Sequence, residues 1–121
     1  MAKKIVIVGA LGYLGTELCK LYSGESWFHN IIAIDSRFVS KRINQLKEWN
    51  IKFYQGGILD KHFLNKHLKD ADVVHHLAGI TDVAYVKKES NSNQDENIKK
   101  IAIEGTNNVL NTISEKCKII F

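Results

Sequence analysis

The sequence predicts a three-layer α/β domain whose five parallel strands form one sheet in the order 3-2-1-4-5, with helices on both faces. Two observations lead to this prediction. Short apolar runs rich in β-branched residues alternate with longer stretches in which apolar residues recur every three or four positions. No proline interrupts this alternation anywhere in the 121 residues. Strand–helix–strand units repeated in this way are joined by right-handed crossovers, which makes their strands parallel.

The first strand is expected at residues 5–8, because a continuous β-branched run suits a strand that is buried on both faces. Glycines then introduce a helix over residues 12–22, and Gly24 follows where the C-terminus of this helix is expected. The inward stripe of the helix is expected to consist of Leu14, Leu18 and either Leu21 or Tyr22.

The next unit repeats this arrangement. Residues 31–34 form a second apolar run, which Asp35 closes. A short helix is expected over residues 39–50, because its apolar side chains are spaced for a single inward face. A third strand then covers residues 51–55, and the glycine pair 56–57 breaks it.

The last elements are expected in the second half of the chain. Asp60 opens a helical stretch, and a fourth apolar strand follows at residues 72–77. A polar loop centred on residues 87–93 leads to a long helix over residues 94–115, whose small and apolar positions form one stripe. A fifth strand begins at residues 118–121. We therefore expect residues 1–121 to form a single domain.

Composition narrows the class of protein. The formal net charge is +4, and the 17 basic residues are scattered among the acidic ones, which favours a solvated surface over a nucleic-acid interface. No stretch approaches the roughly 20 apolar residues that span a bilayer. Cys19 and Cys117 do not form a disulfide framework, and a reducing cytoplasm is the simplest setting for them. His75 and His76 are adjacent on a strand, so they face opposite sides and do not bind one metal ion together.

The clearest motif lies between the first strand and the first helix. Gly9, Gly12 and Gly15 have the spacing of a dinucleotide-binding turn. The first glycine permits a tight turn, the second leaves room for a pyrophosphate, and the third lets the helix pack closely on the sheet. The free N–H groups at the helix N-terminus favour phosphate binding.

An acidic residue supports this interpretation. Asp35 ends the second strand about 20 residues after the last glycine, where a carboxylate accepts hydrogen bonds from the adenosine ribose and repels a 2′-phosphate. The sequence therefore favours NAD over NADP. Arg37 is a basic residue suited to a 2′-phosphate, so NADP stays open as an alternative. The remaining alternative is that the glycines only make turns and Asp35 caps the next helix.

With Tyr13 and Leu14 between its last two glycines, this turn resembles the extended short-chain dehydrogenase/reductase family, in its NAD-dependent nucleotide-sugar epimerase/dehydratase branch. Residues 57–60, 74–79 and 105–110 resemble later motifs of that family. The resemblance implies a Rossmann fold. It also implies that Asp60 pairs with the adenine amino group and that the backbone of Leu59, just before it, contacts adenine. The implied cofactor-binding residues are Gly9, Leu11, Gly12, Tyr13, Leu14, Gly15, Asp35, Ser36, Leu59, Asp60, Leu77, Ala78 and Gly79.

Two departures from the family pattern matter. Ala102 stands where the family usually has an asparagine, and the catalytic Tyr-x-x-x-Lys pair is absent. We therefore expect a chain that stops before the catalytic and sugar-binding parts, has no catalytic residue of its own and is inactive alone. The resemblance implies a nucleotide-sugar substrate and transient hydride transfer to NAD in the whole enzyme. The alternative is a non-catalytic dinucleotide-binding or redox-sensing module. The fifth strand would leave an open sheet edge, which makes a homodimer possible.

Overall fold

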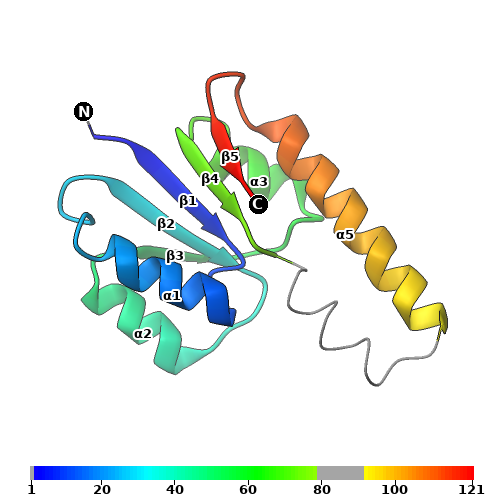
Figure 1. The fold of residues 1–121 in the computed structure, drawn as a ribbon, viewed down its shortest axis with the longest axis horizontal. Coiled ribbons are helices and arrows are strands. Elements are labelled where there is room, and N and C mark those ends of the chain that lie inside the picture. The colour runs from blue at the N-terminus through cyan, green and yellow to red at the C-terminus, as the bar shows by residue number, and fades with distance from the viewer. Residues whose placement is uncertain (1, 79–91) are drawn as a thin grey trace.

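The computed structural model describes residues 2–78 and 92–121, and these form one sheet covered by helices (Figure 1). The strands are β1 (Lys4–Val8), β2 (Asn30–Asp35), β3 (Lys52–Gln55), β4 (Val73–His76) and β5 (Lys118–Ile120). The helices are α1 (Tyr13–Tyr22), α2 (Ser40–Glu48), α3 (Lys61–Leu68) and α5 (Ser92–Thr112). Among the described residues, none of the helices combines the length and apolar character needed to cross a bilayer.

The sheet has the predicted topology. Its strands run in the order β3-β2-β1-β4-β5, and every neighbouring pair is parallel. Strand β1 is central, with Ile5 opposite Ile31 of β2 on one side and Val73 of β4 on the other. The strand order reverses between β1 and β4, and this switch point is where open α/β sheets bind ligands.

Two apolar layers enclose the sheet. Helices α1 and α2 cover one face, and α3 and α5 cover the other (Figure 1). Strand β1 contributes to both layers, because alternate side chains point to opposite faces. Ile5 and Ile7 pack in the layer beneath α1 and α2, whereas Val6 and Val8 pack in the layer beneath α3 and α5. The continuous apolar run of the sequence is thus explained by burial on both faces.

The inward face of α1 differs from the prediction. Leu14 and Leu21 are 54% and 77% exposed, so neither belongs to the inward stripe. Leu18 and Tyr22 pack against the core as predicted, and Gly15 and Cys19, which were not predicted to face inward, are buried beside them. The physical reason is that Gly15 lets the N-terminus of α1 lie against the backbone of the turn at Gly9 and Ala10, while Cys19 packs in the same apolar layer as Ile5 and Ile7 of β1.

Helix α5 begins earlier than expected. Residues 92 and 93, predicted to end the polar loop, belong to its first turn, and the helix ends at Thr112 rather than at residue 115. The rest of the predicted loop, residues 87–91, lies outside the described residues. The other boundaries agree with the expected ones within one or two residues.

Candidate functional site

A pocket opens at the carboxyl end of the sheet, at the switch point. Residues at the ends of four strands, β1 to β4, and one residue of α5 line it: Val8, Gly9, Ile34, Asp35, Ser36, Arg37, Gly56, Gly57, Ile58, Leu77, Ala78 and Ile101. Five predicted cofactor contacts therefore lie together, namely Gly9, Asp35, Ser36, Leu77 and Ala78. Gly79, predicted beside them, lies outside the described residues.

Gly9 makes the turn that leaves β1. Its backbone has φ of 88°, a conformation that side chains rarely adopt. The N–H groups of Gly9 and Ala10 both donate to the Ile34 carbonyl, at 2.8 and 3.0 Å. A Cβ atom at position 9 would lie 2.7 Å from the Ala78 nitrogen. Glycine is therefore required both by the backbone angle and by the close approach of the β4 end.

The turn leads directly into the N-terminus of α1. Gly12 is buried and precedes the first helical residue, and it provides no side-chain cap. Thr16 N–H donates to the Gly12 carbonyl at 2.9 Å, which is where the intrahelical bonding begins. The N–H groups of the preceding residues 13–15 therefore carry the partial positive charge of the helix end. Tyr13 and Leu14, both exposed, are the predicted contacts at this end.

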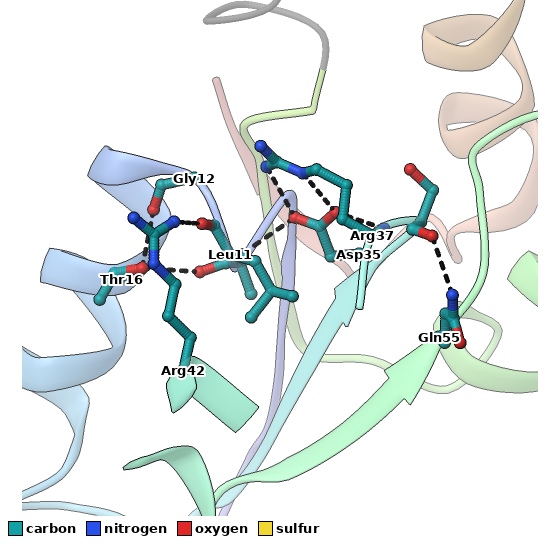
Figure 2. A network of polar contacts seen from close by, with 9 residues as sticks. Leu11, Gly12, Thr16, Asp35, Arg37, Arg42 and Gln55 are labelled. Atoms are coloured by element: carbon teal, nitrogen blue, oxygen red, sulfur yellow. Dashed lines mark hydrogen bonds and ion pairs between the residues drawn. The ribbon is translucent and has the colours of Figure 1, made fainter. Parts of the chain in front are cut away.

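Asp35 points toward the glycine turn. Its carboxylate is buried at the end of β2, and Oδ2 accepts a hydrogen bond of 2.9 Å from Leu11 N–H (Figure 2). Arg37 binds the same carboxylate through its backbone N–H and its guanidinium. Burial alone raises the pKa of Asp35, but the hydrogen bonds from Arg37 and Leu11 outweigh it and lower the pKa below its usual value. Asp35 is therefore an ionised carboxylate fixed against the turn.

Arg42 is a further basic residue at this turn that the sequence interpretation missed. It lies in the first turns of α2, and its guanidinium donates to the Leu11 carbonyl (Figure 2). The side chain of Leu11 is buried in the core, so this residue contributes to the site through its backbone. No local sequence motif predicts the contact of Arg42 with Leu11, because this contact depends on how α2 packs beside α1.

The loop after β3 forms the opposite wall. Asn108 on α5 is buried and donates from Nδ2 to the Ile58 carbonyl at 3.0 Å. Gly105, one turn earlier, lies so close to Ile58 that an added Cβ would collide with the Ile58 side chain. Two residues of the 105–110 motif thus hold the loop in place, a role that the sequence interpretation did not assign.

Leu59 and Asp60 lie beside the pocket, not among the residues that line it. Leu59 is 47% exposed. Asp60 caps α3, and its side chain accepts a hydrogen bond of 3.1 Å from Phe63 N–H. Their contact with adenine therefore stays a prediction. Ile58 and the glycines before it are the residues of this loop that face the pocket.

Three buried histidines lie in or beside the sheet, namely His75 and His76 on β4 and His67 on α3. His75 and His76 face opposite sides of β4, as predicted. His75 Nε2 lies 2.7 Å from the Tyr22 hydroxyl on α1, and His76 Nε2 lies 2.9 Å from Thr106 Oγ1 on α5. Burial lowers the pKa of all three. In the described part of the chain, no three His, Cys, Asp or Glu residues gather as a metal site.

Two curated relatives carry the names of enzymes that act on nucleotide sugars. The chain is 34% identical over 102 residues to a dTDP-D-glucose 4,6-dehydratase from Dictyostelium discoideum, covering 79% of this chain and 24% of that protein. It is 30% identical over 83 residues to a UDP-glucose 4-epimerase from Mycoplasma genitalium, covering 67% and 24%. The chain thus spans about a quarter of the length of the curated relatives it matches.

A solved structure shares the fold. The UDP-glucose-4-epimerase from Stenotrophomonas maltophila, solved with bound NAD and formylated UDP-arabinopyranose, superposes with a TM-score of 0.70 at 18% identity. The superposition covers 91% of this chain and 33% of that one. This likeness confirms the predicted Rossmann-like α/β fold. The model of the 3-beta hydroxysteroid dehydrogenase/isomerase family matches residues 6–120, so the chain belongs to this family, within the extended short-chain dehydrogenase/reductases that it was predicted to resemble.

Proposed function

We propose that this chain is the NAD-binding domain of a nucleotide-sugar epimerase or dehydratase. The observation that carries the proposal is the Asp35 carboxylate, which is buried at the switch point and fixed on the backbone of the glycine turn. A carboxylate in this position orients an adenosine ribose. The relatives named above, a dehydratase and an epimerase of nucleotide sugars, support the substrate class.

The residues present fit a dinucleotide. Gly9 and Gly15 have no side chain at the two positions where backbone segments approach closely, and Gly12 leaves the helix end without a side-chain cap. The diphosphate would be held by the N–H groups of residues 13–15, which favour an anion. Asp35 would orient the ribose, and Leu77 and Ala78 would border the nicotinamide side. These contacts bind and position the cofactor.

NAD, when bound, supplies the hydride acceptor for oxidation of a sugar carbon. The part of this chain is to hold the dinucleotide in one orientation at the carboxyl end of the sheet. Proton transfer from a sugar hydroxyl requires an acid or base within hydrogen-bond reach. The 121 residues contain no Tyr-x-x-x-Lys pair to supply it. We therefore propose that these residues bind the cofactor without turning over a sugar.

Calorimetric titration with NAD and NADH tests the proposal, and two matched variants make it specific to the pocket. Gly57 lines the pocket, and an added Cβ there would meet only the Ser36 Cβ at 3.8 Å, so a longer side chain would extend into space rather than into backbone. Gly24 has nothing within 4 Å. We expect Gly57→Gln to weaken NAD binding about tenfold, as overpacking of about 1–3 kcal/mol implies, and Gly24→Gln to leave it unchanged. Absence of binding by the unmodified protein, or equal effects of the two variants, would contradict the proposal.

A second candidate is a dinucleotide-binding module that senses the redox state without catalysis. The missing Tyr-x-x-x-Lys pair is the observation that favours it. Such a module responds to the redox state only if NADH and NAD bind to it, or to one of its conformations, with different affinities. Similar affinities for NAD and NADH in the same titration would contradict this second candidate and leave the first intact.

A further inference from the structure

The partners of Asp35 leave its carboxylate with no free position for a ligand. Oδ2 accepts from Leu11 N–H at 2.9 Å and from Arg37 Nη2 at 3.0 Å. Oδ1 accepts from Arg37 N–H at 2.9 Å and from Arg37 Nε at 3.0 Å. An ionised carboxylate offers about four acceptor positions. The protein itself therefore fills the positions that the ribose hydroxyls would use.

The two kinds of bond on this carboxylate differ in how easily they can be broken. The bonds from the backbone N–H groups of Leu11 and Arg37 are fixed by the glycine turn and by the end of β2. The guanidinium bonds come from a side chain that is 47% exposed and lines the pocket (Figure 2). Rotation of this side chain frees one acceptor position on each oxygen. Two positions are what a pair of ribose hydroxyls requires, and Asp35 stays anchored by the backbone.

We propose that Arg37 determines cofactor specificity: its guanidinium occupies the ribose-binding positions of Asp35, is displaced when NAD binds, and pairs with the 2′-phosphate when NADP binds. This inference rests on the proposed dinucleotide site. A lone Asp35 would repel the charge of about −1.5 to −2 on a phosphate monoester, whereas the Asp35–Arg37 pair is neutral overall. A planar guanidinium also binds phosphate oxygens through two parallel hydrogen bonds. The site therefore binds both dinucleotides.

The experiment compares NADH and NADPH dissociation constants, measured by the fluorescence of the reduced nicotinamide. Arg37→Ala removes both the competing occupant and the phosphate partner. We expect NADH to bind more tightly and NADPH more weakly, so that the ratio of the NADPH to the NADH dissociation constant rises at least about tenfold, as loss of one charge-assisted pair implies. Arg37→Gln, which keeps most of the side-chain length, is expected to shift the ratio in the same direction. Lys41→Ala, which removes one exposed positive charge on α2, is the control and should leave the ratio unchanged.

The outcomes separate this inference from the proposed function. If the unmodified protein binds neither NADH nor NADPH, both fail. If it binds NADH but Arg37→Ala and Arg37→Gln leave the ratio within about twofold of its original value, or weaken both ligands equally, Arg37 has only a structural role and the inference is overturned. A direct readout needs no variant. The ¹⁵N-resolved signal of Arg37 Nε–H should shift on addition of NADH, and an unchanged signal at saturation would also overturn the inference.

Discussion

Gly15→Ala offers a sharp test of how the glycine turn and α1 fit together. A Cβ atom at position 15 would collide with the Gly9 carbonyl and lie 2.7 and 2.8 Å from Ala10 Cα and C. Ordinary contacts between carbon atoms are about 3.5–4.0 Å. Because the three nearest atoms all belong to the backbone, rotation of a side chain cannot relieve the collision. The N-terminus of α1 must therefore move away from the turn by roughly 1 Å, a shift estimated from that difference.

Two opposing effects set the size of the change. Overpacking lowers the free energy of unfolding by about 1–3 kcal/mol, and we expect about 3 kcal/mol here because the colliding atoms belong to the backbone. The higher helix propensity of alanine returns about 1 kcal/mol. The expected net loss is about 2 kcal/mol in the free energy of unfolding. For a domain of this size it lowers the melting temperature by about 8 °C.

Thermal unfolding followed by far-ultraviolet circular dichroism measures this loss, with Gly24→Ala as the matched control. Gly24 has no atom within 4 Å of an added Cβ and no positive φ. The same substitution there should change stability by less than about 1 kcal/mol, in the stabilising direction. If Gly15→Ala melted at or above the temperature of the unmodified protein, helix propensity alone would govern this position. The close contact between α1 and the turn would then be refuted.

Three further predictions concern Asn108, the cysteines and the buried histidines. Asn108→Ala should lower the free energy of unfolding by about 1–2 kcal/mol, because it removes a buried hydrogen bond to the Ile58 carbonyl. Asn107→Ala, at an exposed position, should change it by less than about 0.5 kcal/mol, and urea titrations measure both variants. Burial raises the pKa of Cys19 to about 12, so mass spectrometry after iodoacetamide treatment at pH 8 should find Cys117 modified first and Cys19 only on unfolding. The buried histidines have pKa values below the usual 6.5, so the unfolded chain binds more protons below that pH. Stability should be full above about pH 6.5 and fall as the pH drops toward 5; a urea midpoint that rises on acidification would contradict this sign.

The sheet and the glycine turn were predictable from the sequence because each depends on a local pattern. The run from Ile5 to Val8 has the composition of a strand that is buried on both faces, and nothing distant alters that requirement. The rotation of α1 was not predictable, since its apolar residues lie around most of the helix. Gly15 and Cys19 face inward because Gly15 is small enough to lie against the turn after β1 and Cys19 packs with Ile5 and Ile7, which is a tertiary effect.

The details of the site that the sequence interpretation missed depend on how the helices pack. A helix N-cap is the commonest position for an aspartate that opens a helix, and Asp60 occupies it. Its hydrogen bond from Phe63 N–H is the capping role that this local rule predicts, and the adenine contact implied by the family resemblance stays a prediction. The contact of Arg42 with the Leu11 carbonyl joins residues 31 positions apart, and no spacing rule connects them. Sequence patterns thus predicted five residues that line one pocket, whereas the contact of Arg42 depends on how α2 packs.

Asp35 has two roles in this arrangement, and they decide which residue can test the site. Its Oδ2 atom holds the Leu11 N–H group within the glycine turn, while the same carboxylate is the proposed ligand of the ribose. Asp35→Ala would leave the Leu11 N–H without its acceptor and loosen the turn that is proposed to hold the diphosphate. A loss of binding in that variant would follow whether or not the carboxylate contacts the ribose. Arg37 is the better position, because removing its guanidinium leaves both backbone hydrogen bonds to Asp35 in place and opens the two acceptor positions that the guanidinium fills.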